Sequence, residues 1–185
     1  MILSPIALAR KTACASWAAR EQNLDGRRHG PHFRAMPQDP FVLPEEASAA
    51  EAIAAIGEEL ALFDDWMERY QHIIDLGRKL PPFPEAWQND AHRVQGCQSK
   101  VWMAAERRAG KLFLAGLSDA AIVAGLVALL LRVYSGREPA EILATGADFL
   151  KEWGLIGALS TNRGNGVAAM ARRIRALAGA PSPAP

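Results

Sequence analysis

The feature that most constrains this fold is an apolar run at the centre of the chain. Residues 120–131 read AAIVAGLVALLL, twelve positions without a polar or charged side chain. A helix needs about 20 apolar residues to span a bilayer, so twelve predict a buried central helix rather than a membrane segment. Ser118 is its expected cap, with Asp119 in its first turn, and Ser135 and Gly136 mark its end.

Two helices are predicted before this run. Residues 48–57 are rich in alanine and favour a helix. Apolar residues then recur at helical spacing from Phe63 to Gly77, which predicts an amphipathic helix with Asp64 or Asp65 as its cap. The proline-rich residues 81–84 end it.

Between these helices and the apolar run, the periodicity changes to that of strands. The short runs HRVQ (92–95), KVWMAAER (100–107) and KLFLAGL (111–117) are compatible with β structure. Residues 108–110, Arg-Ala-Gly, predict a turn between the last two. Further helices are expected after the apolar run, around Pro139–Thr145, Asp148–Leu159 and Asn165–Ala178, the last one following the polar turn STNRGNG. This order predicts an α+β fold.

Cys97 is the only cysteine in the part of the chain that is predicted to fold. A free cysteine is most often a small buried hydrophobe. Here the thiol lies between Gly96 and the polar pair Gln98 and Ser99, directly before an apolar strand. This placement is typical of a loop that presents a side chain to a partner.

Composition excludes several classes of function. The net charge is +1, but residues 1–35 carry +4 and the remaining 150 residues −3, so the domain lacks the basic surface of a nucleic-acid-binding protein. Two cysteines without a C-x-x-C pair exclude a disulfide scaffold and argue against a structural zinc site. A reducing compartment, the cytoplasm, is the expected location.

The first 46 residues differ from the rest, because prolines interrupt them and no apolar periodicity persists. We expect residues 1–46 to be a disordered or mis-annotated extension, residues 47–178 to form the domain, and residues 179–185 to be a disordered tail. Three interpretations of the extension remain open. Translation begins at Met36, or residues 1–35 are an organellar presequence, or they form a functional arm.

Four motifs resemble the SufE family of sulfur-acceptor proteins in iron–sulfur cluster assembly, in the same order and at similar spacing. They are WMERYQHIIDLGRKLP (66–81), VQGCQSKVW (94–102), SDAAIVAGL (118–126) and LSTNRGNGVAAM (159–170). The resemblance covers residues 58–177, departs from many relatives at Leu117, and leaves residues 1–46 unmatched. It implies a SufE/IscU-like fold, a small, mainly antiparallel sheet packed on helices.

The resemblance also implies a function. Cys97 would accept sulfur from a pyridoxal-phosphate cysteine desulfurase of the SufS or CsdA type, stimulate that enzyme, and pass sulfur to an iron–sulfur scaffold or another acceptor. Asp119 would help hold the Cys97 loop, besides its simpler role at a helix start. Arg163 matches an arginine that the family keeps, and it would contact the desulfurase or the persulfide, or serve a structural salt bridge or cap.

The residues favour the same chemistry. A sulfur carrier needs one thiol that becomes a persulfide, whereas a second cysteine would resolve that persulfide into a disulfide. Gly96 supplies backbone freedom, and Gln98 and Ser99 can hydrogen-bond a sulfur anion without attacking it. The sequence shows no pyridoxal-binding or metal-binding constellation, so we expect no cofactor on this chain and an accessory protein rather than a stand-alone enzyme.

Three alternatives stay open. The chain serves a different desulfurase and acceptor in a sister branch of the family, or it is an inert binding subunit. It could also be a thiol hydrolase in which His92 acts as base for Cys97. A continuous strand would place those residues about 16 Å apart, which disfavours the hydrolase. Arg93 and Lys100 either lower the pKa of the thiol or are solvated flanks.

Overall fold

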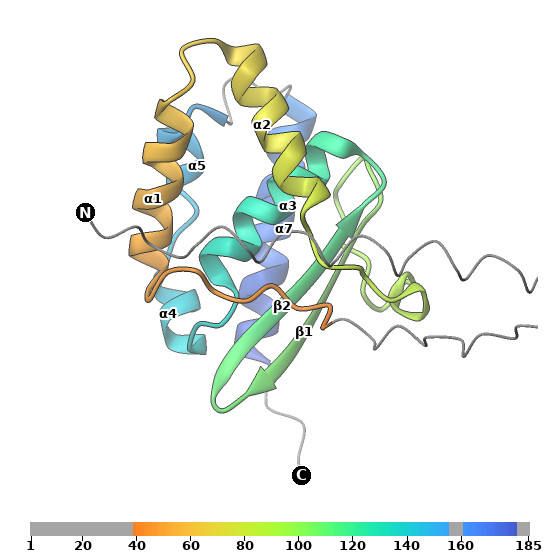
Figure 1. Ribbon diagram of the computed structural model, residues 1–185. Helices are drawn as coiled ribbons and strands as arrows, with labels where there is room; N and C mark the ends of the chain where they lie inside the picture. Colours follow the sequence, from red (N-terminus) through yellow and green to blue (C-terminus); the bar gives the residue numbers. More distant parts are fainter. Residues whose placement is uncertain (1–38, 156–160, 181–185) are drawn as a thin grey trace, which may run out of the picture. The chain divides into compact units, whose positions relative to one another are not determined.

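The computed structural model describes residues 39–155 and 161–180, and predictions for the rest of the chain lie outside the described residues (Figure 1). A two-stranded antiparallel sheet packs with helices, which confirms the α+β class. The elements in chain order are α1 (Ala49–Ala61), α2 (Trp66–Arg78), the 3-10 turn η1 (Glu85–Trp87), β1 (Val101–Arg108), β2 (Lys111–Ser118), α3 (Ala121–Tyr134), α4 (Pro139–Ala144), α5 (Phe149–Glu152) and α7 (Thr161–Gly179).

Helix α3 is the centre of the hydrophobic core, as the apolar run predicts. Ten of its fourteen residues are buried, and it contacts α1, α2, α7 and β2. The contact with α2 is the closest, because a Cβ added at Gly125 would lie 2.1 Å from the carbonyl oxygen of Ile73. Only a glycine allows the two backbones to come this near. Within the described residues, no helix is both long and apolar enough to cross a membrane.

Strands β1 and β2 form a regular hairpin, paired from Val101 with Ser118 to Arg108 with Lys111. The predicted turn lies at Ala109 and Gly110, both with positive φ. Side chains alternate between the two faces of the sheet. Val101, Met103, Leu112 and Leu114 belong to the core cluster around α3. Ala104 and Ala115 face a second cluster, which contains Phe41 and Phe83 and is flanked by Trp87 and Trp102.

Residues 39–46, called here the N-terminal strap, pack on the domain, whereas their sequence predicts that they belong to the extension. The side chain of Phe41 is 4% exposed. The Val42 amide donates to the Leu114 carbonyl on β2 at 2.9 Å, and the Ser135 hydroxyl donates to the Val42 carbonyl. Buried Arg137 donates to the Glu46 carbonyl at 2.6 Å. The packed domain therefore extends at least to residue 39. The strap, although rich in proline and glutamate, forms hydrogen bonds to the domain through its backbone.

The ends of several elements differ from their predictions. The cap of α3 is Ala120 and not Ser118, because Ser118 is the last residue of β2, where it pairs with Val101. Helix α7 begins at Thr161, so residues 161–166 are helical and the expected polar turn there is wrong. Asp65 is the N-cap residue of α2, but its side chain makes no capping hydrogen bond. The HRVQ run pairs with β1 only through a bridge between Arg93 and Trp102.

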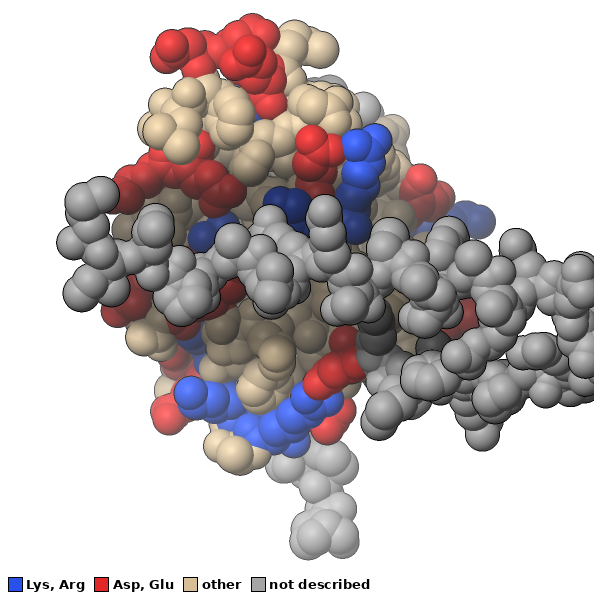
Figure 2. Space-filling model, in the orientation of Figure 1, with Lys and Arg blue, Asp and Glu red and all other residues tan. Residues whose placement is uncertain are grey.

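Charged side chains on the face drawn in Figure 2 are distributed unevenly. Acidic side chains gather over the turn between α1 and α2, and basic ones gather at the tip of the β1–β2 hairpin. The described part of this face therefore carries no continuous basic surface, which agrees with the charge balance of the sequence.

Candidate functional site

Cys97 lies on a loop that leads into β1. The loop closes at its base because the Val94 amide donates to the Val101 carbonyl at 2.9 Å. Next to it, the Met103 amide donates to the His92 carbonyl at 2.8 Å. Gly96 has a φ of 88°, a left-handed conformation that favours glycine over any residue with a Cβ. The chain turns sharply at this glycine and presents the next residue, Cys97, which is half-buried.

The thiol borders a small cavity of about 110 Å³. The cavity is lined from the loop by Cys97, Gln98 and Ser99, from α3 by Val123 and Leu126, and from α7 by Gly166 and Met170. Apolar side chains from two helices thus cover a nucleophile held by a third segment.

Helix α7 reaches the thiol directly through Gly166. The Cys97 Sγ donates to the Gly166 carbonyl oxygen at 3.4 Å. A Cβ added at Gly166 would lie 3.6 Å from Sγ, so the glycine leaves that side of the sulfur open. A carbonyl oxygen accepts a hydrogen bond from a neutral thiol but repels a thiolate. The resting arrangement therefore favours the protonated form.

The electrostatics of the thiol combine two opposing effects. Burial raises the pKa of Cys97 above its ordinary value, and the positive charges of Arg172 and Arg93 partly offset this. The net shift is upward, because removing a thiolate from water costs more than the two cations return. The free protein consequently holds Cys97 mainly as an unreactive thiol at neutral pH.

Asp119 connects the end of the loop to the start of α3. Its Oδ1 accepts from the Lys100 amide at 2.9 Å, and its own amide donates to the Lys100 carbonyl at 3.2 Å. The two bonds fix Lys100 in both directions, three residues after Cys97. The base of the loop is therefore held twice, by the bond between its two arms and by the bonds from Lys100 to Asp119.

The structure brings most of the predicted site residues together. Gly96, Cys97, Gln98, Ser99 and Asp119 all belong to the loop or contact it. Arg163 lies in the first turn of α7, but its side chain is outside the described residues.

His92 has partners other than the thiol. Its Nδ1 lies 3.0 Å from Asn89 Oδ1, and its ring stacks on Trp87 at 5.9 Å between centroids. In the part of the chain that the structure describes, no hydrogen bond joins His92 to Cys97. This arrangement offers no support for a Cys97–His92 hydrolase.

Sequence reasoning did not find the residues that line the cavity from the two helices. Val123 and Leu126 are one helical turn apart on α3, a spacing shared by ordinary core residues. Gly166 and Met170 are one turn apart on α7. The 118–126 motif contains the first pair and the 159–170 motif the second, so the two motifs held the signal for these four residues.

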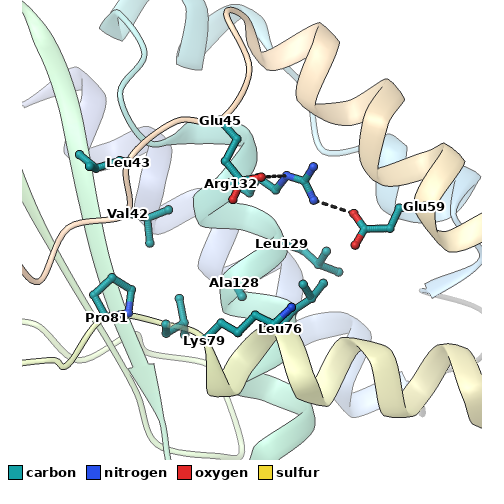
Figure 3. A pocket seen from close by; sticks show the side chains of 11 residues that line it. Val42, Leu43, Glu45, Glu59, Leu76, Lys79, Pro81, Ala128, Leu129 and Arg132 are labelled. Carbon is teal, nitrogen blue, oxygen red and sulfur yellow. Dashed lines mark hydrogen bonds and ion pairs between the residues drawn. The ribbon is translucent and has the colours of Figure 1, made fainter. Parts of the chain in front are cut away.

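A larger cavity of about 370 Å³ lies elsewhere, between the strap and helices α1, α2 and α3 (Figure 3). Arg132 points toward Glu45 and Glu59 there and also bonds to Glu46. Its positive charge is therefore paired with three carboxylates. No cysteine, serine or histidine lines this cavity. Across residues 39–155 and 161–180, no three His, Cys, Asp or Glu side chains converge as metal ligands. The chemistry of the described domain therefore points to Cys97.

Comparison with known proteins gives consistent matches. The family model SufE, described as an Fe-S metabolism associated domain, matches residues 54–178. An uncharacterized SufE-like protein of Rhizobium meliloti is 40% identical over 126 residues, which cover 65% of this chain and 90% of the relative. An uncharacterized SufE-like protein of Synechocystis is 36% identical over 127 residues, covering 69% of this chain and 80% of the relative.

A solved structure also shares the fold. The solution structure of a hypothetical protein from Thermus thermophilus matches with a TM-score of 0.59 at 23% sequence identity. The match covers 69% of this chain and 93% of that one. At this identity the match supports the fold and nothing further.

Proposed function

This chain belongs to the SufE family, and from that premise we propose that it accepts sulfur on Cys97 from a pyridoxal-phosphate cysteine desulfurase. The family domain is associated with Fe–S metabolism. One observation carries the proposal: a half-buried thiol at the turn of a loop, facing a cavity that is lined by both polar and apolar groups and is large enough for a second sulfur atom.

The proposed transfer is a thiol–persulfide exchange. Cys97 first loses its proton to solvent, and its thiolate attacks the outer sulfur of the donor persulfide. A new S–S bond forms on Cys97 while the donor S–S bond breaks, and the donor cysteine leaves as a thiolate. One sulfur atom moves, the charge is the same on both sides, and no external oxidant or reductant is needed. An acceptor thiol on an Fe–S scaffold, or on another sulfur acceptor, would take the sulfur by the same exchange.

The fold around Cys97 suits a carrier. Between donor and acceptor, the outer sulfur of the persulfide is exposed to reduction by small thiols. The cavity beside Sγ offers it an apolar site against Val123, Leu126 and Met170. Removal of sulfur from the donor would also free the desulfurase for its next turnover, so the chain would stimulate that enzyme. In this scheme Asp119 holds the loop, and Arg163 contacts the desulfurase or the persulfide.

Mass spectrometry after incubation with a cysteine desulfurase and cysteine tests the proposal. Cys97 is expected to gain one sulfur atom, and Cys97→Ser to gain none. Cys14→Ser should behave as the parent. In a parallel assay of sulfide release, the parent should raise desulfurase turnover, whereas Cys97→Ser should bind the desulfurase without raising it.

His92→Ala distinguishes the carrier from the hydrolase. The variant is expected to accept sulfur and stimulate the desulfurase like the parent, because His92 bonds to Asn89 and not to the thiol. Stable sulfur on Cys14 with Cys97 unmodified would refute the carrier assignment. So would partner-free turnover of a thiol-reactive ester that His92→Ala abolishes.

A further inference from the structure

Gly166 lies in the interior of α7, as the sixth residue of a helix of nineteen, and it is buried. Glycine is unfavourable in a helix interior compared with alanine, because it loses more backbone entropy on folding. A glycine at such a position indicates either that a neighbouring group comes too close for a side chain, or that the free space itself has a function.

The other helical glycines with described surroundings have structural reasons. A Cβ at Gly77 would lie 2.5 Å, and one at Gly125 2.1 Å, from a backbone atom of the facing helix. A Cβ at Gly57 would meet an indole nitrogen at 3.1 Å, which is tighter than an ordinary contact. Gly179 is the last residue of α7, and glycine is common at the C-terminal ends of helices. The fold thus accounts for all four.

Gly166 has none of these reasons. Its φ is not positive, and the three atoms nearest to its Cβ position all belong to Cys97, with Sγ at 3.6 Å and Cα and Cβ at 3.9 Å. These separations are ordinary van der Waals contacts, so an alanine would fit beside the unloaded thiol without displacing it. The fold therefore tolerates alanine at this position, and the atoms that its side chain would meet first are those of the reactive cysteine.

A second sulfur atom on Cys97 changes what this space can hold. Gly166 and Cys97 line the same cavity of about 110 Å³. In a persulfide the outer sulfur lies about 2.05 Å from Sγ, whereas atoms that are not bonded need about 3.5 Å between them. A methyl group 3.6 Å from Sγ would exclude the outer sulfur from the side of the cavity next to Gly166. Alanine is therefore compatible with the thiol but not with a persulfide that occupies this side.

We propose that the space left free by Gly166 holds the outer sulfur of the Cys97 persulfide, and that a glycine at this position determines how long Cys97 retains that sulfur. This inference rests on the proposed function and assigns one part of the cavity to the transferred atom. The outer sulfur lies next to α7, where Gly166 and Met170 line the cavity. Thiols in solution reach it only when the loop opens.

Gly166→Ala tests the proposal through the lifetime of the persulfide. Parent and variant are loaded with desulfurase and cysteine, the donor is removed, and glutathione is added. The glutathione thiolate takes the outer sulfur and leaves Cys97 as a thiolate, so its loss reports how often the sulfur is exposed. Mass spectrometry follows the fraction of Cys97 that carries one added sulfur. The half-life should be about fivefold shorter in Gly166→Ala, because the methyl group overpacks the sheltered form.

Gly179→Ala is the matched control, since it makes the same change in the same helix with no atom within 4 Å of the new methyl group. Its persulfide should last as long as that of the parent. Two further measurements separate the proposal from a loss of packing. The Tm of Gly166→Ala should rise by about 2 to 4 °C, because alanine favours the helix. Its unloaded thiol should react with a bulky maleimide at the parent rate, because the methyl group fits the resting loop.

Three results would overturn the proposal. One is an equal persulfide half-life in Gly166→Ala and the parent. Another is a Tm several degrees below that of the parent, which would give Gly166 an ordinary packing role. The third is maleimide labelling accelerated as much as the loss of sulfur, because the methyl group would then displace the loop in every state.

The proposed function can fail separately from this inference. If the parent takes no sulfur from the desulfurase, Cys97 is loaded with inorganic polysulfide instead. The thiolate takes one sulfur atom from the polysulfide ion and leaves a polysulfide that is one atom shorter. The comparison of half-lives is then made on the singly loaded form, and the same three results decide it.

Discussion

At the scale of the residue, the reactivity of Cys97 depends on backbone groups that its neighbours hold in place. Gly96 supplies a turn, the Gly166 carbonyl accepts a hydrogen bond from the thiol, and Asp119 fixes the C-terminal end of the loop through Lys100. None of these groups is a base or an acid that reacts. Under the proposed function, these residues determine whether the thiol is presented, and the desulfurase supplies the sulfur.

Asp119→Ala should open the loop. The change removes the hydrogen bond from the Lys100 amide to Oδ1, which is worth about 1 kcal/mol, so the open form should be populated roughly fivefold more. We expect Cys97 to react several times faster with a bulky maleimide at pH 7. Asp148→Ala removes an exposed carboxylate elsewhere and should leave the rate unchanged. Equal rates for parent and Asp119→Ala would show that this bond does not limit access.

Sequence reasoning could find Cys97 and its direct neighbours because they are contiguous. It could not find Gly166, which is 69 positions away and matters only because α7 packs against the loop. Asp119 was expected either at a helix start or as a support for the loop. In the structure its Oδ1 accepts from the Lys100 amide, and the residue stays next to Ala120, the cap of α3.

At the scale of the element, the packing of α2 on α3 depends on two glycines. A Cβ at Gly77 would lie 2.5 Å from the Gly125 nitrogen, and one at Gly125 would lie still closer to Ile73. The apolar run predicted that α3 exists and is buried. It could not predict this close approach, because glycine in a helix interior is unfavourable until a neighbouring backbone requires it.

Gly125→Ala should therefore destabilise the domain, even though alanine has the higher helix propensity. The new methyl group would force α2 away from α3, at a cost of about 2 to 3 kcal/mol. This corresponds to a fall in Tm of roughly 5 to 10 °C, measured by thermal denaturation. Gly179→Ala, at the end of α7 with no atom near its Cβ position, should cause no fall. A Tm for Gly125→Ala equal to that of the parent would contradict the close packing.

At the scale of the whole molecule, the N-terminal strap is part of the domain although its sequence suggests otherwise. Residues 40–46 are rich in proline and glutamate and have no apolar periodicity, so their sequence does not indicate that they pack. Their position is fixed by hydrogen bonds to β2, Ser135 and Arg137. Tertiary partners of this kind cannot be read from a local pattern. Phe41 is the one large apolar residue of the strap that is buried, since Leu43 is exposed.

Two shortened chains test this boundary. A chain beginning at Met36 should melt at the same temperature as the full chain and accept sulfur equally well, because residues 1–35 offer little apolar periodicity to bury. A chain beginning at Ala47 should lose about 3 kcal/mol or more. It lacks the buried Phe41 ring and leaves the guanidinium of Arg137 without the Glu46 carbonyl. Equal melting temperatures for both shortened chains would show that the strap adds nothing.

The strap also has a consequence for the behaviour of the protein at high concentration. The outward edge of β2 is occupied by Val42, which bonds to the Leu114 carbonyl, and by Arg137, which pairs with Leu112. An uncovered edge of this kind is a template on which strands of other chains assemble, and aggregation follows. A protein that lost the strap would then expose part of the edge of β2, so the same eight residues that stabilise the fold also keep neighbouring molecules from assembling along β2.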